Sequence, residues 1–220
     1  MILVVASVGR CVPSGPTVPA RWRAWLDAPT RAAVESDDTA GEAGDEEDRR
    51  HMARLAAGDT HALRPIFDRW KLPLLSYFYR SLGSRADAED LALKVFEHVH
   101  RAAGRFRPEA RFSTWLFAIA RGELLHELRR RRRKPLDPVA PEDLAGIGAP
   151  CDHTAEAEEH LLAALQELPE RQRSAVLLAA AGDLDHPAIA VALGVSVNNL
   201  NVILHRARQA LRERFQRVSP

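Results

Sequence analysis

The chain has little cysteine, few aromatic residues and no apolar run long enough to cross a membrane. Its 220 residues contain only Cys11 and Cys151, which lie far apart and outside any CxxC pattern. This excludes a disulfide framework and a cysteine zinc site, and it fits a reducing cytoplasm. The opening ten residues are apolar, but they are too short to span a bilayer and lack the basic start of a signal peptide. We therefore expect a soluble, cytoplasmic protein without membrane insertion.

The sequence also lacks the patterns of an enzyme. It has no phosphate-cradling glycine loop, no HExxH and no nucleophile elbow. His98 and His100 lie two residues apart on a predicted helix and do not face each other, and Glu123 with His126 is typical of a surface pair. We expect no catalytic residue, no metal site and no cofactor.

Charge is strongly segregated along the chain, although the net charge is only +1. Residues 51–134 carry eighteen Arg and Lys against nine Asp and Glu, whereas residues 135–160 carry none against seven. Residues 1–50 are net acidic and residues 161–220 are slightly basic. A polyanionic partner is therefore expected to meet the 51–134 block and the C-terminal helices.

Alanine is abundant and no segment alternates as a strand would, so the predicted fold class is all-α. We expect two small helical domains joined by a flexible linker, the second containing a helix-turn-helix. The predicted parts are an extension over residues 1–45, a helical domain over 46–134, an acidic Pro- and Gly-rich linker over 135–153, and a second helical domain over 154–216.

The extension mixes Pro, Gly, Ser and acidic residues without a sustained period, so we expect it to be disordered or loosely ordered. Trp22 and Trp25 are the exceptions, because their rings are suited to docking elsewhere. A start codon assigned upstream of the true protein is an equally good explanation. Beyond it, helix caps are expected at Asp59 or Thr60 and at Ser113 or Thr114, and a helix is expected to start near Ser84.

The stretch from Asp185 to Arg208 predicts the helix-turn-helix. Asp185 is a side-chain cap for a short helix, Gly194 suits the tight turn that follows, and Ser196 caps a second helix. The apolar positions of that second helix fall at three- and four-residue steps: Leu200, Leu204, Ala207 and Leu211. This pattern presents a helix to the major groove of DNA, and the alternative is an ordinary helical hairpin in a core.

Six consecutive cations close a predicted helix just before Pro135. They are Arg129, Arg130, Arg131, Arg132, Arg133 and Lys134. Two or three would satisfy the preference of a helix C-terminus for cations, so the longer run favours an external polyanion.

Upstream of that run, aromatic rings interleave with cations, as an unstacked single strand requires. The rings are Phe106, Phe112 and Trp115, and the cations are Arg105, Arg107 and Arg111. The alternative is that the rings fill the core, and we favour that role for Trp115.

Three segments together resemble the extracytoplasmic-function (ECF) branch of bacterial RNA polymerase sigma factors. RFRPEARFSTWLFAIAR with the arginine run resembles the promoter-melting segment, and GSRADAEDLALKVFEHV resembles the helix that docks on the polymerase β′ subunit. The stretch from LPERQRSAV to LRERF resembles the domain that reads the upstream, or −35, promoter element. The resemblance covers about residues 48–215 and implies a transcription initiation factor that binds core RNA polymerase (β′ and β subunits) and promoter DNA. It also implies an anti-sigma partner.

The resemblance implies roles for three sets of residues. Core polymerase would be bound by Asp87, Glu89, Asp90, Leu91 and Lys94. The −10 element would be bound by Arg105, Arg107, Arg111, Phe112 and Ser113, with adjacent backbone on Arg129, Arg130, Arg131, Arg132, Arg133 and Lys134. The −35 element would be bound by Ser196, Asn198, Asn199, Asn201, Val202, His205, Arg206 and Arg208, and Arg212 would also lie near phosphate.

The chain departs from the family at several of these positions. Leu93 and Lys94 replace a usual Gln and acidic residue, and Gly122 and His126 replace a usual Asn and Asp. These changes motivate an alternative: a sigma-like DNA-binding regulator or adaptor that has lost strong core-polymerase binding. In the recognition helix, the asparagines predict readout of adenine, because an amide pairs bidentately with adenine N6 and N7.

Overall fold

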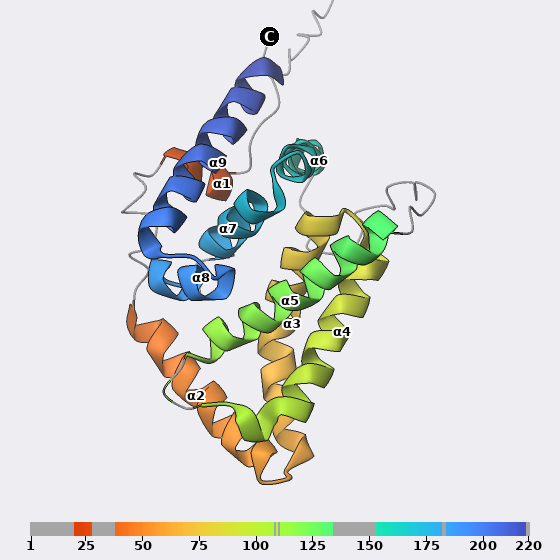
Figure 1. Ribbon diagram of the computed structural model, residues 1–220, viewed down its shortest axis with the longest axis vertical. Helices are drawn as coiled ribbons and strands as arrows, with labels where there is room; N and C mark the ends of the chain where they lie inside the picture. The colour runs from red at the N-terminus through yellow and green to blue at the C-terminus, as the bar shows by residue number, and fades with distance from the viewer. Residues whose placement is uncertain are drawn as a thin grey trace, which may run out of the picture.

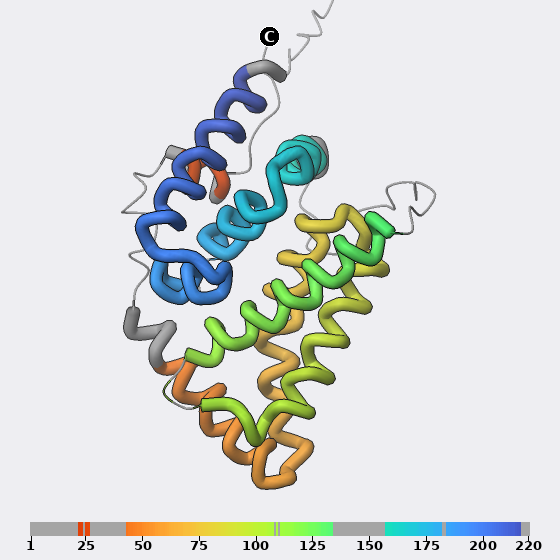
Figure 2. The backbone as a smooth tube through the Cα atoms, viewed as in Figure 1, coloured from red at the N-terminus to blue at the C-terminus, as the bar shows by residue number. Residues whose placement is uncertain are grey.

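The computed structural model describes residues 20–27, 38–107, 109, 111–133, 153–181 and 184–218 (Figures 1 and 2). Its elements are α1 (Ala20–Asp27), α2 (Asp38–Ala56), η1 (Thr60–Ala62), α3 (Leu63–Leu82), α4 (Arg85–Ala102), η2 (Ala103–Arg105), α5 (Phe112–Arg133), α6 (His153–Gln166), α7 (Glu170–Ala181), α8 (His186–Leu193) and α9 (Val197–Val218). Within these ranges every element is helical and no strand is present, which confirms the all-α fold class.

Local capping chemistry builds the helix-turn-helix as predicted. Asp185 accepts a hydrogen bond from the Ala188 amide at 2.7 Å and so caps α8. Gly194 ends that helix with a φ of 63°, a left-handed conformation that glycine adopts without steric cost. Ser196 then accepts a hydrogen bond from the Asn199 amide at 3.3 Å and caps α9. The predicted unit is therefore confirmed as α8, a glycine turn and α9.

The start of α5 differs from the prediction. The helix begins at Phe112, so neither Ser113 nor Thr114 is its cap. Instead, the Phe112 amide donates a 2.7 Å hydrogen bond to Asp45 of α2, which is buried and also pairs with Arg49. A carboxylate from a distant helix satisfies the helix N-terminus, and the charge of that carboxylate suits the positive end of the dipole.

Part of the extension over residues 1–45, which we expect to be disordered or loosely ordered, is helical. Residues Ala20–Asp27 form α1, and α2 begins at Asp38, while the remaining residues of the extension lie outside the described ones. Trp22 and Trp25 are only 2% and 8% exposed, so both rings are docked. Their side chains explain why this short segment is helical here, because an isolated helix of eight residues is unstable in water.

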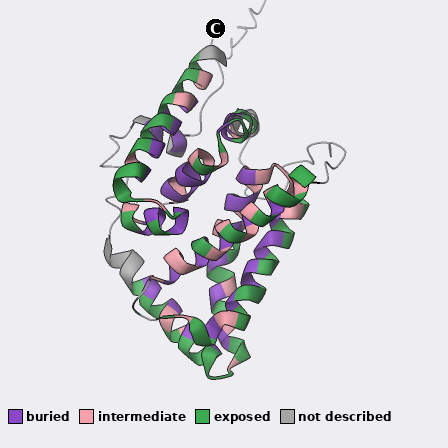
Figure 3. Ribbon diagram, viewed as in Figure 1, coloured by how far each residue is buried: buried purple, intermediate pink, exposed green. Residues whose placement is uncertain are grey.

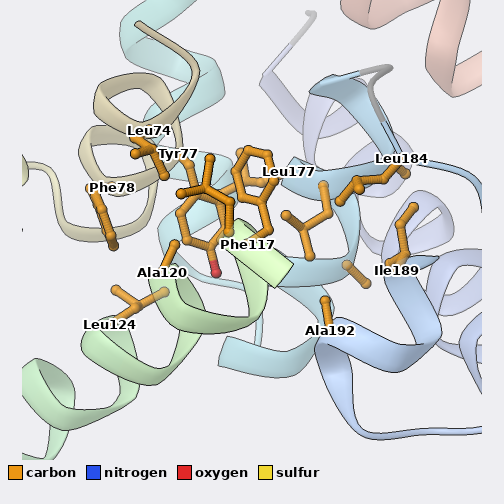
Figure 4. Packing of buried hydrophobic residues seen from close by; sticks show 14 of the residues in the cluster. Leu74, Tyr77, Phe78, Phe117, Ala120, Leu124, Leu177, Leu184, Ile189 and Ala192 are labelled. Atoms are coloured by element: carbon orange, nitrogen blue, oxygen red, sulfur yellow. The ribbon is translucent and has the colours of Figure 1, made fainter. Parts of the chain in front are cut away.

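The two helical units share one hydrophobic core. Side chains of α3 and α5 meet side chains of α7 and α8 across the boundary between the units (Figure 4). The labelled side chains include Phe117 from α5, Tyr77 from α3, Leu177 from α7 and Ile189 from α8, and all are buried. Purple buried positions line the facing sides of the helices and green exposed ones their outer sides (Figure 3). The units are therefore packed against each other, and the predicted linker lies outside the described residues apart from its last residue.

Polar contacts reinforce this packing. The Tyr77 and Ser174 hydroxyls lie 3.1 Å apart, and because Ser174 donates to Glu170 at 3.0 Å, Tyr77 donates to Ser174. Burial raises the pKa of Tyr77, so it remains the neutral donor. Arg173 of α7 donates to the Ser81 carbonyl at the end of α3 at 2.6 Å. These bonds fix the second unit on the C-terminal half of α3.

Candidate nucleic-acid interface

The N-terminal half of α9 presents the predicted upstream-reading residues to solvent. Ser196, Asn198, Asn199, Val202, His205 and Arg206 are exposed, and Asn201 is half-buried. The opposite side of the helix carries the buried Leu200, Leu204 and Ala207, which hold it on α7 and α8. A polar helical face that projects from a helix-turn-helix is the geometry that reads base edges in the major groove.

Arg208 does not join that face. It is 2% exposed, and its guanidinium carbon lies 4.2 Å from the centroid of the Trp25 ring. One turn further on, Arg212 donates a hydrogen bond to the Leu26 carbonyl at the end of α1. Arg208 is therefore not positioned for phosphate in this arrangement, whereas Arg212 is exposed and only one of its N–H groups is engaged by α1.

The aromatic residues before and within α5 form one cluster. The Phe106 ring centroid lies 5.8 Å from that of Phe112 and 5.1 Å from that of Trp115, and Phe112 also packs near Trp70 at 6.0 Å. Phe112 is fully buried and Ser113 is buried too, whereas Phe106 and Trp115 are half-buried. Phe112 is part of the core, and Trp115 packs against that core, as we favoured, but keeps part of its ring exposed, as Phe106 does.

The cations around this cluster have different environments. Arg105 and Arg107 are exposed beside Phe106. Arg111 is half-buried, and its guanidinium lies 3.7 Å from the carboxylate of Asp185, the cap of α8. Arg111, a predicted −10 contact, is thus paired with the unit that carries the predicted −35 contacts.

The arginine run is divided in the same way. Arg130 and Arg131 both bind Glu127, at 2.7 Å and 3.0 Å, and Arg131 also bonds to Asp87 of α4. Arg129, Arg132 and Arg133 are exposed, and no acidic side chain of the described residues lies within ion-pair distance of them. Lys134 lies outside the described residues. Three cations at the end of α5 are therefore available to a phosphate backbone.

Glu127 is the buried anchor of this run. Hydrogen bonds from Arg130 and then Arg131 lower the pKa of its carboxyl to about 2, against the opposing effect of burial. The carboxylate is therefore ionised at every physiological pH and keeps the two guanidinium groups folded back on the helix.

Only some of the residues that we expect to face polymerase are exposed on α4. Asp90 and Lys94 are exposed, and Glu89 is exposed beside Arg85 at 3.0 Å. Leu91 is buried in the core, so its placement on the surface is corrected, and Asp87 is engaged by Arg131. Leu91 supports the helix from beneath rather than contacting a partner.

An open apolar hollow beside this surface was not predicted. It has a volume of about 540 Å³, lies between α3 and α4, and is lined by Leu63, Phe67, Leu93, Phe96, Glu97, His100 and Arg101. Leu93 is 56% exposed at its rim, an unusual environment for a large apolar side chain. In the sequence, Leu93 stands out only as a departure from the family pattern. Helical periodicity does not show where the apolar side chains of two helices leave a hollow between them.

Other classes of site receive little support from the described residues. No group of three or more metal-ligating side chains is found among them, and Glu123 lies 3.9 Å from His98 of α4 rather than pairing with His126. No single described helix is both long and apolar enough to cross a membrane; α8 and α9 pass such a test only as a pair bent by 92°.

An arginine-ended helix with an aromatic cluster at its start, joined to a helix-turn-helix unit, defines a bipartite nucleic-acid-binding protein. The family model for sigma-70 region 2 matches residues 66–134, and that for sigma-70 region 4 matches residues 158–211. The chain belongs to the ECF branch of the sigma-70 family, the promoter-specific transcription initiation factors that act with RNA polymerase.

Relatives and a solved structure agree with this assignment. The chain is 33% identical to RNA polymerase sigma factor CarQ of Myxococcus xanthus, over 74% of this chain and 94% of CarQ. It is 32% identical to ECF RNA polymerase sigma factor SigF of Caulobacter vibrioides, over 76% of this chain and 93% of SigF. Its fold is similar to that of sigma factor RpoE of Bartonella quintana, solved with the anti-sigma factor NepR, with a TM-score of 0.58, 23% identity and coverage of 70% of this chain and 98% of that one.

Proposed function

We propose that this sigma factor grips a promoter at two places, with α5 and its preceding loop on the −10 element and α9 on the −35 element. The observation that carries the proposal is the pairing, in one chain, of half-open aromatic rings beside free arginines with an exposed polar face on a helix-turn-helix. One surface suits an unstacked strand and the other suits an intact duplex.

Phe106 and Trp115 receive bases of the separated strand in this proposal. Each ring already packs on Phe112, which fixes its orientation before any base arrives. Arg105 and Arg107 then contact the backbone of the same strand, and Arg129, Arg132 and Arg133 neutralise phosphates further along it. Unstacking a base costs a few kcal/mol, and stacking of about 1–3 kcal/mol per base with polymerase contacts offsets that cost.

Polymerase docking uses the outer side of α4. Asp90 and Lys94 supply the polar part, and Leu93 with the neighbouring hollow supplies an apolar seat. This distribution makes docking on this chain more apolar than the acidic pattern usual for the family. It also explains how the chain retains a docking surface although Lys94 has the opposite charge.

Promoter binding requires the two units to separate. The −10 and −35 elements lie about 25 base pairs, or about 85 Å, apart on the duplex, whereas a compact chain of this size has a radius of gyration of only about 17 Å. The 19 residues between α5 and α6 reach about 65 Å when extended, which is enough for the units to occupy separate elements together with their own dimensions. The packed arrangement is therefore the resting state.

An anti-sigma partner is part of the proposal, and the complex of RpoE with NepR supports it. Two tethered units that did not pack together would leave apolar faces open for such a partner. Those faces are packed against each other, with Tyr77 and Phe117 in the boundary. The partner must therefore bind an outer surface of the resting state or stabilise separated units.

The test uses purified full-length protein, core RNA polymerase and a fork-junction promoter with single-stranded −10 bases. Specific capture of the fork junction only when both proteins are present supports the proposal, and Phe106→Ala with Trp115→Ala should abolish it. Lys94→Glu should strengthen core binding because it removes the reversed charge, whereas Leu93→Gln should weaken it by removing the apolar seat. Binding of duplex DNA without any binding to core polymerase would instead favour the regulator.

A further inference from the structure

Helix α1 lies against both helical units, beside α9 in Figure 1. Trp25 stacks on Arg208 of α9, and the Leu26 carbonyl accepts a hydrogen bond from Arg212 of the same helix. Trp22 lies 5.8 Å from the guanidinium of Arg80 on α3. The eight residues of α1 thus touch one helix of the first unit and the recognition helix of the second.

The contacts on α9 substitute for those of a nucleic-acid backbone. A helix C-terminus carries partial negative charge on its free carbonyls, so the Leu26 carbonyl is an acceptor of the kind that a phosphate oxygen provides. The Trp25 ring covers the neighbouring guanidinium with the negative face of its π-system. Arg208 cannot make its contact and reach DNA at the same time, because it has almost no exposed surface. Arg212 is exposed, but the N–H group that bonds to Leu26 is not available to a phosphate while α1 is docked.

The contact on the other unit makes α1 a bridge. Arg80 stacks near Trp22 and also lies 3.4 Å from Glu158 of α6, so one side chain joins α1, α3 and α6. Trp22 itself packs edge-on against Trp25 with ring centroids 6.0 Å apart. Undocking α1 would remove the rings of Trp22 and Trp25 from the hydrophobic core that the two units share.

The contacts that dock α1 on the two units leave a buried polar group without a hydrogen bond among the described residues. The Trp25 indole N–H is buried, yet no acceptor among the described residues reaches it, which weakens the docked state relative to one with every group satisfied. Helix α1 also lies outside both family matches, which begin at residues 66 and 158. The units therefore fold as sigma regions 2 and 4 without requiring α1 as part of either pattern.

We propose that Ala20–Asp27 is an intramolecular clasp that holds the two units together, masks Arg208 and engages Arg212, so that promoter binding requires its release. The masking part of this inference rests on the proposed function of α9, whereas the holding part does not. Release exposes Arg208, returns the bonded N–H group of Arg212 to solvent and allows the units to separate in the same event. The clasp thereby links the closed state to the loss of upstream DNA binding.

The test compares the full chain with the variant Trp22→Ala/Trp25→Ala. The matched control is Arg23→Ala, which changes an exposed residue on the same helix. Small-angle X-ray scattering measures the radius of gyration, and fluorescence anisotropy measures binding to a short duplex carrying the upstream element. We expect the double variant to have a larger radius and to bind the duplex at least tenfold more tightly, with a steeper salt dependence, while the control matches the wild type.

Each combination of results decides a different part. An unchanged radius with unchanged duplex binding would overturn the clasp. If the radius increases but neither the wild type nor any variant binds the duplex, both the masking role and the proposed function of α9 are overturned. The role of α1 in holding the two units together would still stand. Adding Arg208→Ala to the double variant should reverse most of the gain in affinity.

A second experiment keeps the native residues of α1 and releases the helix only after the protein has been purified. A specific protease site inserted between Asp27 and Asp38 allows α1 to be cut free after purification, which lowers its effective concentration at the junction. Duplex affinity should then rise as in the double variant, and an added peptide of residues 20–27 should lower it again. A peptide with both tryptophans changed to alanine should have no effect, and inhibition by that peptide would overturn the proposal.

Discussion

The arginine-rich end of α5 and the arginine-bearing side of α9 are built from the same residue type but lie in opposite environments. On α5, two arginines fold back on Glu127 of their own helix and three remain exposed. On α9, Arg208 is buried and Arg212 is engaged by a helix from the far end of the chain. The difference shows that the availability of a cation depends on which acceptor reaches it, and only the α5 acceptor is close in sequence.

Removing the exposed cations of α5 should have the largest effect. Arg129→Ala/Arg132→Ala/Arg133→Ala should weaken binding of the polymerase complex to a fork-junction promoter by about 100-fold at low salt and reduce the salt slope by about 2. The measurement is a titration at several potassium chloride concentrations. Removing Arg50, Arg64 and Arg171 changes the net charge equally and should have little effect.

Glu127→Gln should break the internal pairing on α5. It removes a buried charge that holds two guanidinium groups, so the free energy of unfolding should fall by about 2 kcal/mol at neutral pH. Because folding lowers the pKa of the carboxyl from 4.5 to about 2, its contribution is complete above pH 4.5 and is lost as pH falls toward 2. Urea unfolding at pH 7 and pH 3 measures this, with Glu123→Gln as the control, and an equal deficit at both pH values would contradict it.

Substitutions in the exposed N-terminal half of α9 should change the base preference of the protein at the upstream element. Asn199→Ala or Asn201→Ala should cost about tenfold in discrimination for adenine in the upstream element, within the range of about 1–3 kcal/mol for one bidentate contact. Selection from a randomised promoter library reports the preference directly. Gln209→Ala, an exposed amide further along the same helix, should leave it unchanged. A library without adenine enrichment would rule the readout out.

The smallest expected effect is a pH dependence of stability that arises from His186 in α8, which lies near the charge of Arg208 on α9. Burial, and then the charge of Arg208, lower the pKa of His186 below its ordinary value of 6.5. The unfolded chain therefore takes up a proton below about pH 6.5 before the folded protein does, so stability is greater above that pH and declines as pH falls. We expect a decline of under about 1 kcal/mol in thermal or urea unfolding. His186→Gln should flatten it, whereas the exposed His205→Gln should not.

Local chemistry explains which parts of the fold are predictable from sequence. Ser84, Asp185 and Gly194 act within four residues of themselves, so composition and spacing were sufficient to place them. The exposed face of α9 follows from helical periodicity in the same way. Each of these features depends on the backbone conformation of one segment and on little else.

The features that sequence reasoning missed all depend on partners distant in the chain. Asp45 lies 67 residues from the amide that it caps, and Tyr77 lies 97 residues from Ser174. Arg208 lies four residues after Leu204 and three before Leu211, beside the apolar stripe of α9, but the pattern does not indicate that Trp25 packs on its guanidinium group. The tryptophans were the one visible signal, since apolar rings in a polar segment imply a docking site without indicating where.

The hydrogen bond from Phe112 to Asp45 has a consequence for exchanging parts between sigma factors. The region 2 match begins at residue 66, yet the residue that sets where α5 starts belongs to α2. A chimera joined at the edge of the match would inherit α5 without its anchor. The first turn of α5 would then unwind or shift, and the rings of Phe106 and Trp115, which pack on Phe112, would move with it. In this protein the exchangeable module is therefore longer than the region 2 match, and it begins with α2.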